Sequence, residues 1–154
     1  MKKTESRYTF ASQTPKFGNV QFDSKAEYNC FLMIKKYFPL NRIKIHQPLI
    51  IRPENVWFPE QKWKIDFEIT GVDELASSSL FIEYKGVIED SFKERLKSVA
   101  HNRPGVYQDL VVVTSTQRLV TRGLLSVTVP QLEKALANKD YRSLVVNCKK
   151  ERNV

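Results

Sequence analysis

Three ionisable side chains, Asp66, Glu83 and Lys85, have the types and the spacing of a metal-assisted hydrolytic site. They lie in two segments that alternate apolar and polar residues, 63–69 and 80–86, which is the pattern of half-buried strands. Successive side chains of a strand point to opposite faces, so Glu83 and Lys85 project from the same side. If the two strands pair, Asp66 lies beside them. Two carboxylates and an ammonium group suit a hard divalent cation and the positioning or deprotonation of water.

The triplet by itself leaves a second interpretation open. Glu-x-Lys occurs by chance in many proteins, and on a solvated strand face it can form a cross-strand ion pair with no catalytic role. The separation of Asp66 from Glu83 is ordinary for a hairpin with a modest loop.

A helix is predicted upstream of the strands, from about residue 23 to residue 37 or 38. Asp23 and Ser24 are good N-cap residues, Glu27 follows at the distance of a capping box, and Pro39 ends the helix. Five residues recur at helical spacing and predict its buried stripe: Ala26, Cys30, Met33, Ile34 and Tyr37.

The order of these motifs resembles the PD-(D/E)XK nuclease superfamily. Residues 22–28 have the form Phe-x-Ser-x-x-Glu-Tyr, and a strand with Gln47-Pro48, a strand with Asp66 and the Glu83-x-Lys pair follow. The residue before Asp66 is not the proline of the nominal motif, a position that is loose in the superfamily. The pattern resembles three branches of the superfamily, which are phage junction resolvases of the endonuclease I type, the endonuclease subunit of heteromeric transposases, and small uncharacterised phage nucleases.

The resemblance covers about residues 17–116 and implies a fold and an activity. The fold is α/β, a restriction-endonuclease-like core of helix, three strands, helix and strand, with a central mixed sheet flanked by helices. The activity is Mg²⁺-dependent hydrolysis of DNA, with Mn²⁺ as a substitute, at junctions or transposon ends. The implied catalytic residues are Glu27, Asp66, Glu83 and Lys85. The implied metal ligands are Glu27, Asp66, Glu83 and the backbone carbonyl of Tyr84.

Two residues keep alternative roles. Glu27 either belongs to the site, as the resemblance implies, or only caps its own helix. On the first strand, Gln47 matches a glutamine that lies near the site in the resembled families. Its neighbour His46, which must point the other way, is the weaker candidate of the two.

The charge balance favours a polyanionic partner. The net charge is +8 and the pI is about 9.5, and lysine and arginine bind phosphates with release of condensed counterions. A second helix, from Asp90 to about Asn102, is basic over much of its surface. The residues expected to contact DNA are Gln47, Lys93, Arg95, Lys97 and Arg103.

The remaining segments predict a single domain over residues 1–154, with a core at about 17–116 and an extension at 117–154. A strand at 43–51 contains Pro48, which indicates an edge or a bulge, and the apolar run 109–114 is typical of a strand buried on both faces. A short helix is expected at 130–136. Trp57 and Phe58, in a polar loop, are predicted to form satellite core rather than to touch nucleic acid. The basic end, 149–152, is either a solvated tail or a phosphate-binding arm.

Several protein classes are excluded by what the sequence lacks. There is no apolar run of membrane-spanning length, no apolar stretch typical of a signal peptide near the N-terminus, and no zinc-type cysteine spacing. We therefore expect a cytoplasmic protein of a bacterial or phage-infected cell, acting as a homodimer or within a recombination complex. Two alternatives remain, namely a homing or mismatch-nicking endonuclease of the same core, and a DNA-binding protein that keeps the fold without catalysis.

Overall fold

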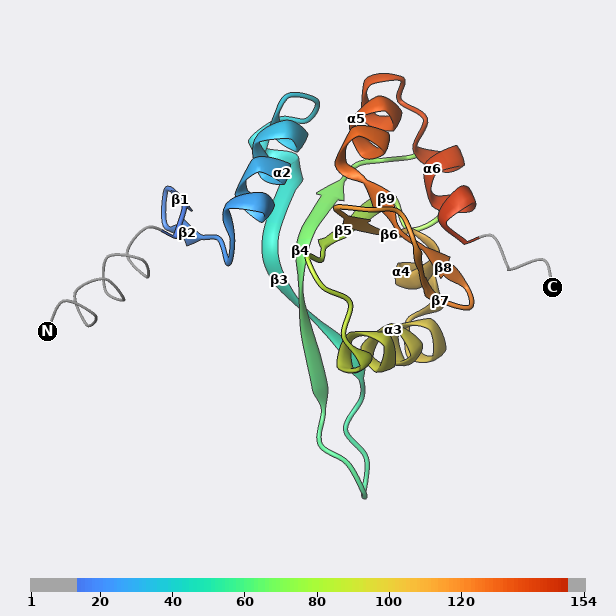
Figure 1. The fold of residues 1–154 in the computed structure, drawn as a ribbon. Coiled ribbons are helices and arrows are strands. Elements are labelled where there is room, and N and C mark those ends of the chain that lie inside the picture. The colour runs from blue at the N-terminus through green and yellow to red at the C-terminus, as the bar shows by residue number, and fades with distance from the viewer. Residues whose placement is uncertain (1–13, 150–154) are drawn as a thin grey trace, which may run out of the picture.

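The computed structural model describes residues 14–149, and in this range the chain has an α/β fold (Figure 1). The strands of its main sheet are β3 (Ile43–Arg52), β4 (Gln61–Thr70), β5 (Ser79–Tyr84), β6 (Leu110–Thr114) and β9 (Val127–Thr128). The helices are α2 (Lys25–Lys35), α3 (Asp90–Asn102), α4 (Pro104–Gln108), α5 (Val129–Ala137) and α6 (Tyr141–Cys148). The smaller elements are the pair β1 (Lys16–Phe17) and β2 (Val20–Gln21), the 3₁₀ turn η1 (Leu40–Arg42), and the pair β7 (Leu119–Thr121) and β8 (Leu124–Leu125).

The main sheet is mixed, as expected. Its strand order across the described residues is β3-β4-β5-β6-β9, with antiparallel pairing from β3 to β5 and parallel pairing from β5 to β9. The parallel step from β5 to β6 needs a crossover, and α3 and α4 supply it. The predicted order of helix, three strands, helix and strand is therefore present in α2, β3, β4, β5, α3 and β6.

Aromatic side chains attach the helices to β4. Phe31 of α2 stacks on Phe67, with ring centroids 6.2 Å apart. Phe92 of α3 meets Trp63 edge-on at 6.0 Å. In Figure 1, α2 lies beside one end of the β3–β4 pair and α3 lies across the pair nearer its loop. The two helices thus fix β4 at two points on either side of Asp66 in sequence.

The sequence places the start of α2 correctly and its end too late. Ser24 is the N-cap, and its Oγ accepts a hydrogen bond from the Glu27 backbone N–H at 3.1 Å. The helix ends at Lys35, two or three residues before the predicted end. Ala26 is exposed, contrary to expectation, because the first turn borders an open cleft rather than the core.

Strands β3 and β4 form a long hairpin whose loop projects from the body of the molecule (Figure 1). Among the described residues β3 is an edge strand, which agrees with the prediction from Pro48. The expectation of satellite core around the loop aromatics is wrong. Trp57 is 83% exposed and Phe58 is 54% exposed, because no other element within residues 14–149 packs over the projecting loop.

The extension completes the fold rather than forming a separate unit. Strand β9 continues the parallel part of the sheet, and α5 packs against both α2 and α6. The predicted short helix is α5, whose N-cap Thr128 forms a capping box with Gln131. The sequence did not predict the other elements of the extension, which are β7, β8, β9 and α6.

Both chain ends lie largely beyond the described residues. Of the basic end, Lys149 lies in the structure, where it is largely buried and donates a hydrogen bond to the Leu110 carbonyl. Residues 150–152 and the N-terminal residues 1–7 lie outside the described part. Among the described helices, none combines the length and the apolar character needed to cross a membrane.

Candidate active site

An open cleft of about 640 Å³ lies where the N-terminus of α2 faces the ends of β4 and β5. The four residues predicted to be catalytic all line it, and so does Tyr84. These residues are Glu27, Asp66, Glu83 and Lys85. Three elements that are distant in sequence therefore bring together the residues that the motifs selected.

The cleft opens because β4 and β5 stop pairing through their backbones at this point. Their last backbone-paired residues are Phe67 and Ile82, and the same register continued by one step sets Asp66 opposite Glu83. Beyond the pair Phe67 and Ile82, the backbone N–H groups donate to side-chain carboxylates instead of to carbonyl oxygens of the facing strand. The Asp66 N–H donates to Glu83 Oε1 at 3.0 Å, and the Tyr84 N–H donates to Asp66 Oδ2 at 2.8 Å. Each carboxylate is thus held by one oxygen, and the other oxygen is free of these backbone bonds.

Lys85 is held close to the second carboxylate oxygen of Glu83. Its Nζ lies 3.6 Å from Glu83 Oε2 and 4.8 Å from the ring centroid of Phe92. The ammonium group is largely shielded from solvent, and the ring face attracts a cation. Asp66, Glu83 and Lys85 therefore lie together as the strand pattern predicted.

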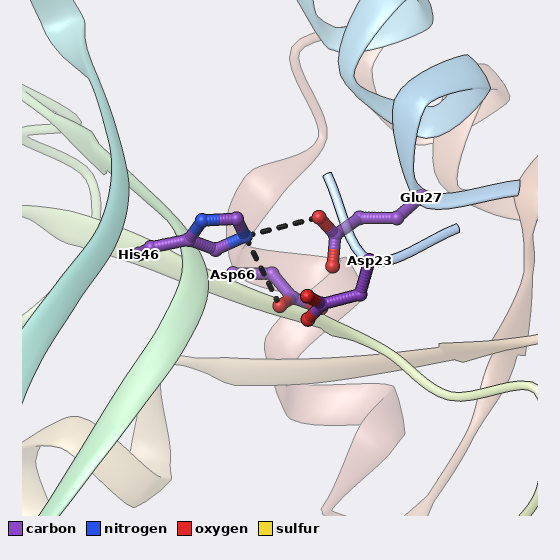
Figure 2. A group of neighbouring side chains, drawn as sticks. All are labelled: Asp23, Glu27, His46 and Asp66. Carbon is purple, nitrogen blue, oxygen red and sulfur yellow. Dashed lines mark hydrogen bonds and ion pairs between the residues drawn. The ribbon is translucent and has the colours of Figure 1, made fainter. Parts of the chain in front are cut away.

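His46 is the neighbour of Glu27 that sequence reasoning undervalued. Its Nε2 lies 3.0 Å from Glu27 Oε1 and 3.9 Å from Asp66 Oδ1 (Figure 2). The pairs on either side, Ile45 with Phe67 and Gln47 with Ile65, set His46 opposite Asp66 on the neighbouring strand. His46 adopts a left-handed backbone conformation with φ of 55°.

This contact shows where the carboxylate of Glu27 lies, which bears on the two roles predicted for it. The Glu27 backbone N–H is capped by Ser24, whereas its carboxylate reaches across to β3 and bonds to His46. The side chain is buried in the cleft, and a hydrogen bond with the backbone of Asp23 also connects it to the start of its own helix. Gln47, which the sequence favoured over His46, is exposed on β3 outside the cleft.

Four side chains form a group with the dimensions of a cation site. Asp23, Glu27, His46 and Asp66 each offer a ligand atom, and these atoms all lie within 4.8 Å of one another (Figure 2). Carboxylate oxygens suit Mg²⁺ or Mn²⁺, and the imidazole nitrogen suits transition-metal ions better than Mg²⁺. The donor set therefore fits a divalent cation.

Two members of this group, Glu27 and Asp66, were predicted metal ligands, and two were missed. Asp23 lies four residues before Glu27, a spacing that places two side chains on the same side of a helix. This spacing is a pattern in the sequence that could have identified Asp23. His46 becomes visible only once the register of β3 against β4 is known. Glu83 lines the same cleft but lies outside this group of four.

Burial of several acids in one place raises their pKa values. The pKa of Asp66 is raised to about 8, mainly by burial and next by the charge of Glu27. Burial also raises the pKa of Glu83 to about 8, with Asp66 as the next contribution. The pKa of Glu27 is raised mainly by burial as well. A bound cation would relieve this repulsion, because it favours the charged form of each acid.

The rim of the cleft carries basic side chains, of which one was predicted. Arg95 lines the cleft with its guanidinium 5.6 Å from the ring centroid of Trp63. Lys62 and Lys64 of β4 line it too and were not singled out by the sequence.

The other predicted DNA contacts are distributed elsewhere. Lys93 and Lys97 border a separate groove beside Arg122, and Lys97 pairs with Glu94 at 2.9 Å. Arg103 donates a hydrogen bond to the Ile50 carbonyl of β3 at 2.9 Å. The structure therefore does not unite the basic residues of α3 into one surface at the cleft.

Comparisons with protein-family models, with curated proteins and with solved structures found no significant match to this chain. The resemblance to the nuclease superfamily accordingly depends on the motif residues alone. The chain has an α/β fold and a cleft with side chains that could hold a cation.

Proposed function

We propose that this chain is a metal-dependent DNA endonuclease with a restriction-endonuclease-like core. The observation that carries the proposal is the gathering of three buried acids, Glu27, Asp66 and Glu83, around a cleft that also contains Lys85. Three buried acids so close together repel one another when charged, and a bound cation would offset this repulsion. Such a cluster is what we expect of a site that binds a cation. The order of the elements from α2 to β6 agrees with the core of the proposed fold.

The metal would be held by Glu27, Asp66 and Glu83, with Asp23 and His46 as further donors and the Tyr84 carbonyl as the ligand that the resemblance implies. Magnesium binds through few carboxylates and keeps several waters, which suits a site of this composition. A divalent cation supplies Lewis acidity toward a phosphate oxygen and lowers the pKa of water. Because His46 adds a nitrogen donor, we expect Mn²⁺ to support activity at least as well as Mg²⁺.

Lys85 would act on the reacting phosphate group. Its ammonium group is preorganised by Glu83 and by the ring of Phe92, so no rearrangement is needed as negative charge develops. It would position the attacking water and offset charge in the transition state. The hydrogen bonds from the Asp66 and Tyr84 N–H groups fix the carboxylates on which Lys85 depends.

DNA is the proposed substrate because of the charge around the cleft. Lys62, Lys64 and Arg95 border the acids, and the net charge of the chain is +8. An acidic centre with a basic rim lets the backbone of a polyanion approach while the cation is held. Cleavage at branched junctions or at transposon ends is the specificity that the motif resemblance suggests.

Nicking of supercoiled plasmid DNA tests the proposal. The chain should convert the plasmid to nicked circles with Mg²⁺ or Mn²⁺ and leave it intact in EDTA. Asp66→Asn and Glu83→Gln should each abolish nicking, because both remove a charged metal ligand while keeping the hydrogen-bonding shape. A labelled four-way junction compared with the linear duplex of the same sequence would then define the substrate.

Glu68→Gln is the matched control for these two variants. Glu68 lies on the same strand as Asp66, two residues away, and its carboxylate accepts a hydrogen bond from Ser79 outside the cleft. This variant should nick normally. Residual nicking by Glu83→Gln at saturating Mg²⁺ would contradict the site assignment. DNA binding without any nicking by the unmodified chain would favour the non-catalytic alternative.

A further inference from the structure

The loop of the β3–β4 hairpin presents three apolar side chains to solvent, of which Val56 and Trp57 are more exposed than Phe58. Val56 is 93% exposed and Trp57 is 83% exposed, and Figure 1 shows this loop at the far end of the hairpin from α2. Exposed apolar side chains that lie next to one another are typical of interaction sites, whereas single ones are common on any surface. The core of this domain does not use any of these residues.

The loop is ordered by its own hydrogen bonds. Asn55 Oδ1 accepts from the N–H groups of Trp57 and Phe58, both at 2.8 Å, and the Asn55 N–H donates to the Phe58 carbonyl at 3.0 Å. Arg52 adds a bond to the Pro59 carbonyl at 3.2 Å and lies over the ring of Phe58. The conformational entropy of the loop is thus largely lost before any partner binds, which favours binding through Trp57.

The same hairpin also forms one wall of the candidate active site. Asp66 and the rim residues Lys62 and Lys64 belong to β4, which leads directly from the cleft to the loop. Trp57 precedes Asp66 by about nine residues, so extended chain of ~3.3 Å per residue separates them by at most roughly 30 Å. A duplex with its backbone at the cleft would reach the loop within about nine base pairs of ~3.4 Å each.

The composition of the loop indicates the kind of contact it makes. Residues 53–60 contain no lysine or arginine but include Glu54 and Glu60, and Glu60 pairs with Lys62 at 3.6 Å. Such a loop is not suited to bind phosphate. Its exposed indole can stack on the face of any base, a contact worth about 1–3 kcal/mol in single-stranded nucleic acid.

We infer that Trp57, supported by Val56, is a wedge that stacks on a DNA base where the duplex is interrupted. This inference rests on the proposed function and adds a substrate feature to it. Apolar wedges enter most easily where stacking is already broken, as at an unpaired base or a branch point. The hairpin would therefore place an interruption of the duplex at a fixed distance from the scissile phosphate.

Tryptophan fluorescence can follow this contact directly. The chain has two tryptophans, and the second, Trp63, is only 4% exposed. The probe DNAs are a duplex with one unpaired base and a fully paired duplex of equal length. They are added to Glu83→Gln in EDTA so that no cleavage occurs. We expect the interrupted duplex to quench Trp57 emission and protect it from acrylamide more than the paired duplex does.

Affinity measured by anisotropy of the labelled DNA gives the second readout. Trp57→Ala should weaken binding to the interrupted duplex about tenfold, the equivalent of one stacking contact, with a smaller change for the paired duplex. Trp57→Phe should restore much of the affinity, since a phenyl ring also stacks. Val146→Ala, which truncates an exposed apolar residue of α6, is the control and should change neither affinity.

The outcomes distinguish failure of the wedge alone from failure of the nuclease proposal. Normal DNA binding and nicking with unchanged Trp57 emission would overturn the wedge alone. Loss of self-association in Trp57→Ala, with DNA affinity unchanged, would also overturn it and assign the loop to an interface between copies of the chain. If the chain with Trp57 intact bound neither duplex, the proposed function would fail and the wedge with it.

Discussion

The carboxylates of Asp66 and Glu83 each accept a backbone hydrogen bond with one oxygen and keep a second oxygen outside that bond. One oxygen accepts a backbone N–H in place of the missing strand pairing, and this fixes the direction of the other. Such fixation is how a site keeps its geometry without a lid or a rearrangement. Strand alternation predicts that Asp66, Glu83 and Lys85 meet, but the divergence of the strands depends on tertiary packing, and no local pattern encodes it.

Lys85 offers a test of chemistry as distinct from binding. Lys85→Ala should lower the single-turnover rate constant by about 10²-fold, because an electrostatic stabiliser of the transition state is removed. DNA affinity should change little, since the basic side chains of the rim, Lys62, Lys64 and Arg95, remain. An unchanged chemical step would make Lys85 only the ion-pair partner of Glu83.

His46 offers a test of cation preference. His46→Ala removes the nitrogen donor from the group of four but leaves the oxygens of Asp23, Glu27 and Asp66. Activity with Mn²⁺ should therefore fall more than activity with Mg²⁺, because imidazole favours transition-metal ions. The concentration of each ion that gives half-maximal nicking is the measurement. An equal loss with both ions would mean that His46 only holds Glu27 in place.

At the scale of elements, α2 shows how a cap can serve a site. The Ser24 hydroxyl fixes the first turn, and that turn carries both Asp23 and Glu27 to the cleft. Ser24→Ala should lower the free energy of unfolding by about 1 kcal/mol. Because the first turn would also fray, metal affinity should fall more than stability alone explains. Thermal melts and cation titrations compared with Ser91→Ala, an exposed serine of α3, would show the difference.

Helix α3 presents its basic residues in two directions, so substitutions on its two sides should differ in their effect on DNA binding. Arg95 faces the cleft, whereas Lys97 pairs with Glu94 and borders another groove. Arg95→Gln should reduce the slope of log affinity against log salt by about 0.9, and Lys97→Gln should leave it unchanged. If both substitutions reduced the slope by the same amount, DNA would contact both sides of α3.

The sequence predicts these elements unequally, for physical reasons. Long alternating or amphipathic segments such as β4 and α3 carry their own periodicity. Strand β9 has two residues and forms only by pairing with β6, so its signal lies in a distant segment. Ala26 was assigned to the core because helical spacing identifies a stripe, but the cleft beside the first turn is a property of the assembled fold.

For the whole molecule, the buried acids of the cleft lower the stability of the fold when they are charged, because burial disfavours their charged forms. The pKa values of Asp66 and Glu83 are raised to about 8 in the folded state. As the pH rises from about 4 to about 8, the unfolded chain releases these protons before the folded chain does. Without a cation, the free energy of unfolding contributed by these groups should therefore fall through this range, by at least about 1 kcal/mol, the equivalent of one pKa unit.

Urea unfolding at pH 5 and at pH 8, with and without Mn²⁺, measures this effect. The cation should stabilise the chain more at pH 8, where the acids are charged, because it binds the folded site and not the unfolded chain. Asp66→Asn should reduce the loss of stability at pH 8 in EDTA, since it removes one of the buried charges. Equal stabilisation by Mn²⁺ at both pH values would contradict this account of the site.

The edge strand β3 has a consequence for the behaviour of the protein in concentrated solution. An open strand edge is a template for aggregation, and proteins suppress it with proline, charge and local distortion. In β3 the left-handed backbone of His46 and the missing N–H of Pro48 interrupt the regular edge, and Lys44 adds an exposed charge. His46, which belongs to the group of side chains able to hold a cation, thus also distorts the edge against intermolecular pairing. Substitutions that straighten β3 to alter metal selectivity should lower solubility as well, so the two properties would have to be optimised together.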